Sequence, residues 1–303
     1  MSFLEKAKPY LQLVRLPNVF TAAADSWAGW LVAAGTFAHP ERWGLVVGAS
    51  MLIYAGGIAL NDAFDADEDL LERPGRPVAA GRVSLGSALV LAYLLLGTGL
   101  TMATFGSVFS GHWPGLAIAP CLVACVVAYD GGGKKTPLGP LLMGLCRGLN
   151  LLMGMALAPG YGGPSGWSAA LGVTLFVAGI TVISRSETSV GKRAGTGLGL
   201  VLESLGLTLV AVACVQPWGG RAFSPWSGLV VLAVVVVFLA RAGSRAWTEA
   251  TPRTTQRAVK AAVFSLVWLN VALVAALRGP FMALPVAALW LPAYLLGKWL
   301  YST

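Results

Sequence analysis

Charged side chains are scarce in this 303-residue sequence, which contains 13 acidic residues and two histidines. Asp, Glu, Lys and Arg together make up 11% of the chain, whereas hydrophobic residues make up 56%. A typical soluble domain is roughly a quarter charged. A water-soluble fold needs a polar exterior that this composition does not supply. The sequence therefore excludes a single soluble domain and indicates a protein whose solvent is lipid.

Residues that ligate soft metals or form disulfides are also few. His39 and His112 both fall in loops predicted to lie outside the membrane, so a histidine-based metal site is not expected. The cysteines fall inside apolar segments and show no CxxC spacing, so we interpret them as small buried apolar residues. They are Cys121, Cys125, Cys146 and Cys214.

Long apolar runs are abundant. They continue over about 17 to 22 residues without alternating polar positions, which favours membrane-spanning helices over a β-barrel. We predict an all-α, polytopic transmembrane helix bundle that forms one domain over residues 1–303, with nine or ten spans. The last run contains Pro285 and Pro292, which interrupt a helix, so it is the run that we exclude if the number of spans is nine. The ten runs are 18–38, 44–64, 85–106, 114–129, 138–158, 167–184, 197–216, 226–241, 259–277 and 281–300.

The formal net charge of +8 would suit a nucleic-acid partner, but the positions of the basic residues argue against one. If the N-terminus is cytoplasmic and the spans alternate, the basic residues gather in the inside loops. Arg42, Arg221 and Arg278 are those left outside. This asymmetry follows the positive-inside rule. We therefore predict an integral protein of the cytoplasmic (inner) membrane with a cytoplasmic N-terminus, contacts with membrane lipid and no nucleic-acid partner.

Six of the thirteen acidic residues lie in one segment, NDAFDADEDLLE at 61–72. Asn61, Asp65 and Asp69 recur every four residues and so share one helical face. Carboxylates at this density repel one another unless a cation or a basic partner neutralises them. Oxygen ligands on one stripe suit Mg²⁺, which completes its shell with water and phosphate oxygens. We predict Mg²⁺ as the cofactor here; a solvated charged loop is the alternative.

The next segment, RPGRPVAAGRVS at 73–84, places Arg73 and Arg76 in a loop stiffened by two prolines. Basic groups beside a metal-binding acidic stripe suit a polyanionic diphosphate. A positively charged cytoplasmic loop is the alternative, and both roles are compatible.

These two segments resemble the first Asp-rich motif and the following loop of the UbiA-type intramembrane prenyltransferases, Nxx(x)Dxxx(D) followed by RPxRP. The resemblance extends from Arg15 to about Gly195 and includes VRLPNVFTA, YDGGGKKTPLG and GLCRGLNLLMG. It implies nine spans around a cavity in which Mg²⁺, held by two facing Asp-rich motifs, assists ionisation of a prenyl diphosphate. An acceptor ring or hydroxyl then captures the carbocation. The matching positions outside the first motif are Arg15, Asn18, Tyr129, Lys134, Lys135, Arg147 and Asn150.

The segment that corresponds to the second Asp-rich motif of this family departs from the pattern. It reads TVISRSETSVGKRAG, with Glu187 as its one carboxylate. Either Glu187 helps to hold a single metal, or Arg185 and Lys192 contact the phosphates in place of a second cation. A Glu187→Gln variant with unchanged Mg²⁺-dependent diphosphate binding would exclude the first option. The S-R-x-E signature resembles a branch of the family found in ebo-type metabolite gene clusters.

Ionisable residues inside the spans are further candidates, because burying them in a membrane is costly. Asp25, Arg147 and Glu203 are of this kind. For Asp25, a place in the lining of the cavity and an ion pair between helices both remain open.

The sequence as a whole predicts a prenyltransferase that moves an isoprenyl group from a prenyl diphosphate to an unidentified acceptor. Asp65, Asp69 and Glu187 are the predicted catalytic residues, and together with Asn61 they are the predicted metal ligands. One alternative is a non-catalytic protein of the same fold that carries an isoprenoid or a metabolite precursor. Another is a secondary transporter, which the lack of an internal repeat disfavours. The predicted substrate-binding residues are Arg15, Asn18, Arg73, Arg76, Tyr129, Lys134, Lys135, Arg147, Asn150, Arg185 and Lys192.

Overall fold

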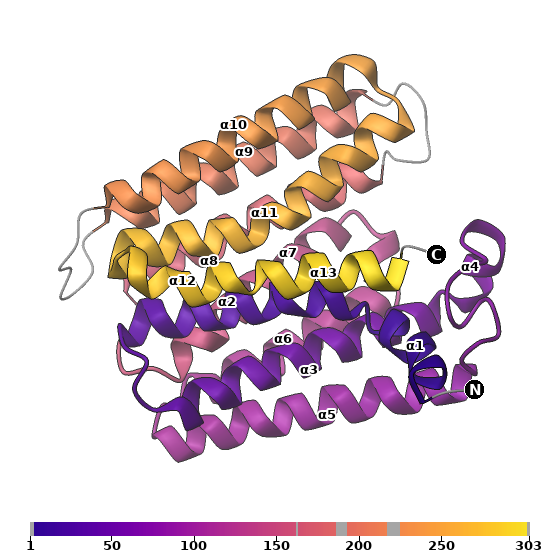
Figure 1. The fold of residues 1–303 in the computed structure, drawn as a ribbon, viewed down its shortest axis with the longest axis horizontal. Coiled ribbons are helices and arrows are strands. Elements are labelled where there is room, and N and C mark those ends of the chain that lie inside the picture. Colours follow the sequence, from indigo (N-terminus) through magenta and orange to yellow (C-terminus); the bar gives the residue numbers. More distant parts are fainter. Residues whose placement is uncertain (1–2, 162, 186–192, 217–224, 302–303) are drawn as a thin grey trace.

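Helices make up the regular structure of the described part of the chain, as the sequence predicted (Figure 1). The computed structural model describes residues 3–161, 163–185, 193–216 and 225–301. The helices are α1 (Phe3–Leu13), α2 (Leu16–Ala34), α3 (Pro40–Phe64), α4 (Ala66–Glu72), α5 (Leu85–Ser110), α6 (Gly115–Asp130), the 3₁₀ turn η1 (Gly133–Lys135), α7 (Gly139–Ala156), α8 (Pro164–Ser184), α9 (Arg193–Val215), α10 (Trp226–Glu249), α11 (Pro252–Arg278), α12 (Pro280–Ala288) and α13 (Trp290–Tyr301).

All ten apolar runs predicted from the sequence are helical. Among the described residues, eight helical segments are long and apolar enough to cross a membrane. They comprise α3, α5, α7, α8, α9, α10, α11 and the combined α12–α13 segment, whereas α2 and the 16-residue α6 fall below that measure. The structure therefore supports an integral-membrane protein, and the count of nine or ten spans stays a prediction.

The last apolar run, which the sequence marked for exclusion, is among these eight but is divided in two. α12 ends at Ala288 and α13 begins at Trp290, with Pro292 in its first turn. Pro292 has no N–H to donate to the carbonyl of Ala288, so the helical hydrogen-bond ladder is interrupted there.

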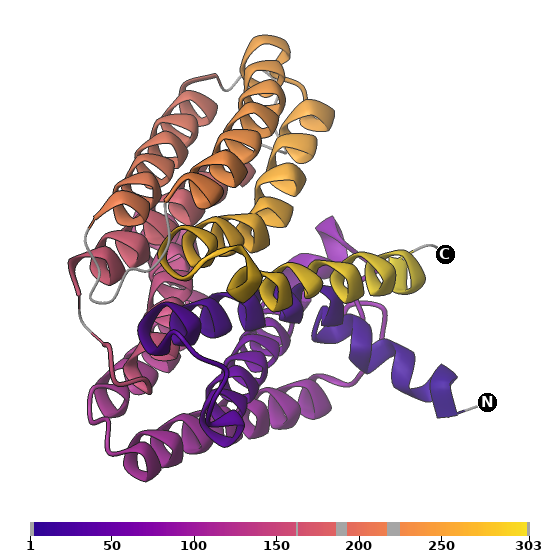
Figure 2. The same cartoon turned by 60° about the vertical axis from the view of Figure 1, so that its left-hand side comes forward.

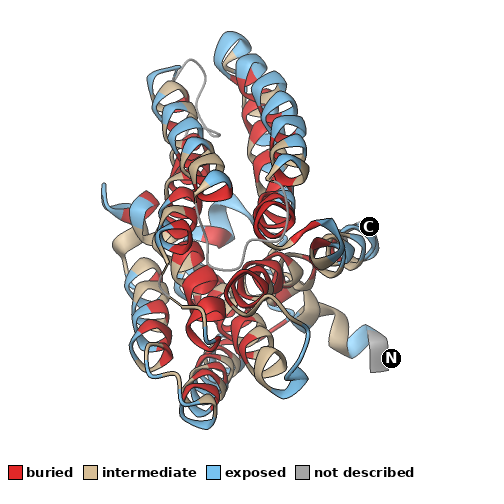
Figure 3. Ribbon diagram, turned by 90° about the vertical axis from the view of Figure 1, so that its left-hand side faces the viewer, coloured by how far each residue is buried: buried red, intermediate tan, exposed pale blue. Residues whose placement is uncertain are grey.

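The outward faces of the helices are apolar. On α5, Val90 and Leu94 are 61% and 62% exposed, and on α10, Val230 and Val234 are 62% and 66% exposed. Figure 3 shows that most helices have a buried inner face and an exposed outer face. Continuous exposed apolar surface is unfavourable in water, so these faces are suited to lipid.

The bundle is built around the neighbouring helices α2, α7 and α8. α3 packs on α2 and carries α5 on its far side, while α9 packs on α8 and α10 on α11. Figure 2 shows α3 and α5 on one side of the molecule and α9, α10 and the first part of α11 on the opposite side.

Two glycines bring the backbones of α2 and α7 into contact. A Cβ atom at Gly29 would collide with the carbonyl of Leu151, and one at Gly154 would collide with the carbonyl of Ser26. Small residues of this kind allow close approach of helices in membranes. The α2–α7 pair is therefore a closely packed support for the polar residues that it carries.

Several helix ends converge at one end of the bundle, which we call the mouth end. α3 ends there at Phe64 and α6 at Asp130, while α2 begins at Leu16 and α7 at Gly139. Segments that are distant in sequence thus bring their polar ends together.

Candidate active site

A cavity of about 520 Å³ begins at the mouth end and extends between the helices. Polar side chains line the mouth and also the deep end. The lining also includes the apolar side chains of Ile53, Leu122 and Val126. The cavity can therefore hold a ligand with a polar head and an apolar body.

Three oxygen-bearing side chains, Asn61, Asp65 and Asp130, line the mouth of this cavity. Asn61, in the last turn of α3, donates a hydrogen bond from Nδ2 to Asp130 Oδ1 at 2.9 Å. Asp65 follows α3 directly, and its backbone N–H still bonds the Asn61 carbonyl at 3.0 Å. Asp65 thus lies one turn beyond Asn61.

This donor set fits Mg²⁺. Within the described residues, no group of three or more His, Cys, Asp or Glu side chains is placed to hold a metal ion. Mg²⁺ does not need such a group, because one or two carboxylates with water and phosphate oxygens complete its shell. Asn61, Asp65 and Asp130 supply two carboxylates and an amide oxygen to one space. A cation there would depend on oxygen atoms of a bound ligand.

Asp69, the third member of the predicted stripe, lies outside the cavity lining. Its side chain is 5% exposed, and Arg76 Nη1 donates to Asp69 Oδ2 at 2.6 Å. The same nitrogen is 3.3 Å from Asp62 Oδ1, which Arg15 also approaches at 3.3 Å. The helix breaks at Asp65, where φ is −94° and ψ is 7°, so the stripe does not continue on one straight face. Asp69 is neutralised by Arg76, and Asp130 joins Asn61 and Asp65 instead.

The turn between α6 and α7 brings two ammonium groups to the acidic segment. Lys134 Nζ lies 2.5 Å from Asp65 Oδ1 and Lys135 Nζ lies 2.6 Å from Glu68 Oε2. The hydrogen bond and charge of Lys135 lower the pKa of the Glu68 carboxyl. Both lysines line the cavity, so each could leave its carboxylate partner and pair with an anion bound there.

Arg185, at the end of α8, holds this turn in place. Its Nη2 donates to the carbonyl of Lys134 at 2.6 Å and to that of Thr136 at 2.9 Å. The sequence predicted that Arg185 contacts phosphate directly. The structure shows that part of the guanidinium group binds the backbone that carries Lys134, while the residue also lines the cavity.

The other predicted substrate-binding residues differ in position. Arg15, Arg73, Arg76 and Tyr129 line the cavity, and so do Arg147 and Asn150. Asn18 is half-buried but is not one of the lining residues; its backbone carbonyl accepts a hydrogen bond from Thr21 Oγ1 at 2.7 Å. Glu187 and Lys192 lie outside the described residues.

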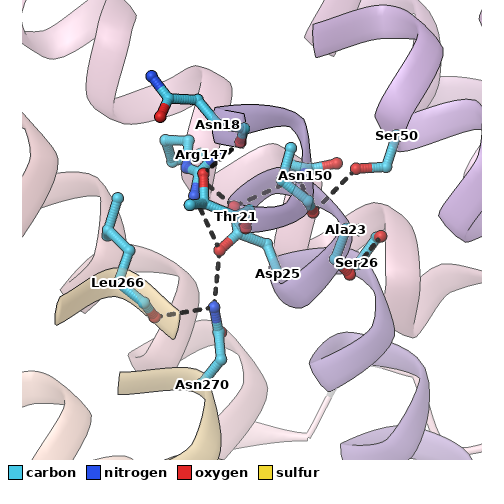
Figure 4. A network of polar contacts seen from close by, with 11 residues as sticks. Asn18, Thr21, Ala23, Asp25, Ser26, Ser50, Arg147, Asn150, Leu266 and Asn270 are labelled. Atoms are coloured by element: carbon cyan, nitrogen blue, oxygen red, sulfur yellow. Dashed lines mark hydrogen bonds and ion pairs between the residues drawn. The ribbon is translucent and has the colours of Figure 1, made fainter. Parts of the chain in front are cut away.

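The deep end of the cavity adjoins a buried polar network centred on Asp25 (Figure 4). Arg147 Nε lies 2.9 Å from Asp25 Oδ2, and Arg147 Nη2 donates to the Thr21 carbonyl at 3.0 Å. Asn270 Nδ2 donates to Asp25 Oδ1 at 2.7 Å. Of the two roles that the sequence left open for Asp25, the structure shows the ion pair between helices. Glu203, the other acidic residue that the sequence placed inside a span, is buried on α9 and is not part of the cavity lining.

Asp130 is the site residue that the sequence analysis missed. It is the last residue of α6 and is followed by three glycines and two lysines. An acid at the end of an apolar helix, directly before a basic turn, is the signal that would have identified it.

Comparisons with known proteins agree with this architecture. The UbiA prenyltransferase family matches residues 22–260. The digeranylgeranylglyceryl phosphate synthase of Halobacterium salinarum is 29% identical over 281 residues, which cover 85% of this chain and 94% of that relative. A solved structure of digeranylgeranylglyceryl phosphate synthase superposes with a TM-score of 0.67 and 21% identity, over 90% of this chain and 99% of the other. A UbiA homologue from Archaeoglobus fulgidus bound to GPP and Mg²⁺ gives a TM-score of 0.59 and 12% identity, over 88% and 99% of the two chains.

Proposed function

Because this chain belongs to the UbiA prenyltransferase family, we propose that it transfers an isoprenyl group from a prenyl diphosphate to the hydroxyl group of a lipid acceptor. The observation that carries the proposal is the placement of Asn61, Asp65 and Asp130 in one cavity with Lys134 and Arg73. Oxygen ligands and cations side by side suit a metal-bound diphosphate.

The metal would be held by Asn61, Asp65 and Asp130. Bound Mg²⁺ neutralises charge that develops on a departing diphosphate. That the Archaeoglobus fulgidus homologue binds GPP and Mg²⁺ supports this assignment. The second Asp-rich motif of the family is replaced by a segment whose one carboxylate is Glu187, so we propose one metal held mainly by the first motif and Asp130.

The basic side chains of the mouth then bind the phosphates. Lys134 is paired with Asp65, and we propose that it transfers to a phosphate oxygen when a cation takes Asp65. Arg73 lines the same mouth, is exposed and is free to turn toward the anion. These contacts are charge-assisted and favour departure of diphosphate over its return to the allylic carbon.

The apolar wall protects the reactive carbon. Ile53, Leu122 and Val126 line the cavity below the mouth. Because they exclude water, the allylic cation meets the acceptor before it meets a solvent hydroxyl. The isoprenyl chain itself is apolar and fits this wall.

The acceptor that we propose first is an isoprenylglyceryl phosphate with one free hydroxyl group. The names of the relatives, digeranylgeranylglyceryl phosphate synthases, support this choice. The bond from C1 to the diphosphate oxygen breaks with its electron pair on the diphosphate. The acceptor oxygen forms an ether bond to C1, and the hydroxyl proton passes to a phosphate oxygen or water.

A carrier that binds an isoprenoid diphosphate without turnover is the second candidate. It is favoured by the pairing of Asp65 with Lys134, which competes with a metal for the carboxylate. The two functions share a binding site and differ in whether diphosphate is released.

The test uses the full-length protein in lipid nanodiscs with radiolabelled geranylgeranyl diphosphate, with and without Mg²⁺ and geranylgeranylglyceryl phosphate. Mg²⁺-dependent formation of the ether and release of diphosphate support the transferase. Tight binding without release, with every acceptor tried, supports the carrier. Absence of diphosphate binding excludes both. Asp65→Asn should lose the Mg²⁺-dependent activity. Asp67→Asn is its matched control, because Asp67 belongs to the same acidic segment but is exposed and does not line the cavity.

A further inference from the structure

α11 and α13 diverge toward the mouth end of the bundle. α12 packs along α11, but the helix is interrupted at Leu289 and α13 packs on α2 instead. The last residues of α13 are held by α1, where Gln12 Nε2 donates to the Leu300 carbonyl at 2.9 Å. Figures 1 and 2 show α11 and α13 close together beside α12 and farther apart toward the C-terminus of α13. Toward the mouth end, the facing sides of these two helices therefore do not pack on each other.

An aromatic series begins where the two helices meet. The rings of Trp268 on α11 and Trp290 on α13 have centroids 6.5 Å apart. Trp290 stacks on Tyr294 at 5.0 Å, and the Nζ atom of Lys298 lies 4.6 Å from the centre of the Tyr294 ring. These three residues of α13 recur every four positions, so they share the side of α13 that faces α11.

α11 carries a matching series. Phe264 and Lys260 lie four and eight residues before Trp268, so they share the side of α11 that Trp268 turns to α13. Phe264 is 39% exposed and Trp268 is 37% exposed. Lys260 lies about 12 Å along α11 from Trp268, and Lys298 lies about 12 Å along α13 from Trp290, at 1.5 Å per residue. The two lysines are therefore at a similar depth, on the mouth side of the aromatic rings. We call the six residues of the two series the α11–α13 surface: Lys260, Phe264, Trp268, Trp290, Tyr294 and Lys298.

The charge of this surface is positive. Residues 250–303 contain no Asp or Glu. Within the described part of the chain, neither Lys260 nor Lys298 forms an ion pair with a carboxylate. None of the six residues lines the cavity. The α11–α13 surface is thus separate from the candidate active site and attracts anions.

We infer that the α11–α13 surface binds one anionic phospholipid of the surrounding bilayer. The lipid phosphate lies between Lys260 and Lys298, whose ammonium groups donate charge-assisted hydrogen bonds to it. The acyl chains lie along the aromatic rings and fill the space between the two diverging helices. This inference does not depend on the proposed function.

Two other occupants suit the surface less well. A phosphatidylcholine lipid brings a quaternary ammonium group, which competes with the two lysines for its own phosphate. A second copy of this chain, related by a two-fold axis, would bring its own Lys260 and Lys298 to the same surface, so that like charges would face one another. The charge of the surface therefore favours a lipid whose headgroup is negative.

The experiment offers the full-length protein, in a mild detergent, equal amounts of dioleoyl phosphatidylglycerol and dioleoyl phosphatidylcholine. Native mass spectrometry counts the lipid molecules that stay bound. We expect the native protein to retain one phosphatidylglycerol with a preference of roughly tenfold, since two basic residues attract the headgroup. Phosphatidylglycerol should also raise the thermal midpoint more than phosphatidylcholine does, because a ligand of the folded state stabilises it.

In Lys260→Met/Lys298→Met the preference should fall below about twofold. Arg241→Met/Arg245→Met is the matched control, because it removes the same charge from exposed positions on α10, and it should keep the preference. If the lysine double variant does not fold, each single lysine variant should lower the preference by about threefold.

Three results would overturn the inference. They are equal retention of the two lipids by the native protein, an unchanged preference in the folded lysine variants, and an equal loss in the lysine and arginine variants, which would show general attraction to the basic end of the bundle. Addition of Mg²⁺ and geranylgeranyl diphosphate should leave the bound phosphatidylglycerol in place, because the surface lies outside the cavity lining. Displacement of the lipid would make this surface part of the substrate path and would also overturn the inference.

Discussion

The ammonium group of Lys134 lies 2.5 Å from the carboxylate of Asp65, and both residues line the mouth of the cavity. The lysine therefore supplies to this carboxylate the positive charge that a bound metal ion would supply. Under the proposed function, a metal-bound diphosphate would separate this pair, and a phosphate oxygen would become the new partner of Lys134.

Replacing Lys134 should strengthen the binding of a metal ion and weaken the binding of diphosphate. In Lys134→Met, Mn²⁺ alone, used as a paramagnetic substitute for Mg²⁺, should bind more tightly because Asp65 is released. Mg²⁺-dependent binding of geranylgeranyl diphosphate should weaken about 10- to 100-fold, the range for loss of one charge-assisted contact. Lys298→Met is the control, since Lys298 lies over the ring of Tyr294 and is not one of the residues that line the cavity. Weakening of both ligands in Lys134→Met would contradict the exchange.

Asp130 should behave as a metal ligand and Asp62 as a structural residue. We expect Asp130→Asn and Asp65→Asn to raise the Mg²⁺ concentration needed for prenyl transfer by tenfold or more, because each loses a charged oxygen ligand. Removal of Mg²⁺ with EDTA should abolish activity of the native protein. Asp62→Asn should leave the Mg²⁺ requirement unchanged but lower the thermal midpoint, since Arg15 and Arg76 lose their shared partner. Titration of the initial rate with Mg²⁺ checks each variant.

Arg185 should act through the turn that it holds. In Arg185→Gln the carbonyls of Lys134 and Thr136 lose a charged donor. Hydrogen–deuterium exchange of residues 131–138 should become faster, and diphosphate binding should weaken by roughly tenfold. Arg82→Gln is the control, because Arg82 bonds Gln12 and the Gly75 carbonyl instead. Weaker binding with unchanged exchange would indicate direct phosphate contact by Arg185.

Removal of Asp25 should destabilise the protein, because Arg147 would be left buried without a counter-charge. We expect Asp25→Leu to cost about 3–5 kcal/mol and Asp25→Asn to cost less, since the amide still accepts a hydrogen bond. The double variant Asp25→Leu/Arg147→Met should recover much of the loss. Thermal unfolding in detergent measures all three. Equal stability of Asp25→Leu and the native protein would exclude a supporting role for this ion pair.

The contact between α2 and α7 should be sensitive to a single methyl group. A Cβ atom at Gly154 would meet the Ser26 carbonyl, whereas one at Gly97 on α5 has nothing within 4 Å. Gly154→Ala should therefore cost about 1–3 kcal/mol through overpacking. Gly97→Ala should be neutral or stabilise by about 0.5–1 kcal/mol, because alanine favours the helix. Thermal midpoints of the two variants provide the comparison, and similar values would contradict the close approach.

The sequence by itself determined the class of fold and the region of the site. Ten apolar runs indicated the helices because the chain has too little polar surface for water, and each run is helical in the structure. The segment around Asn61 and Asp65 indicated an oxygen-rich site because so few acids occur elsewhere. The family followed from the same motifs, whereas the ebo-type branch and the orientation in the membrane stay predictions.

The tertiary structure alone decided which charges meet. The four-residue spacing predicted that Asp69 shares a helical face with Asp65. In the structure the helix breaks at Asp65, and Asp69 forms an ion pair with Arg76 outside the cavity lining. Asp130 instead lies beside Asn61, because α6 ends next to the end of α3. The hydrogen bond between them joins residues 69 positions apart in the sequence. The pairing of Asp25 with Arg147 likewise depends on the packing of α2 against α7. Local periodicity fixes the face of one helix, whereas an ion pair depends on where two helices end and how closely they approach.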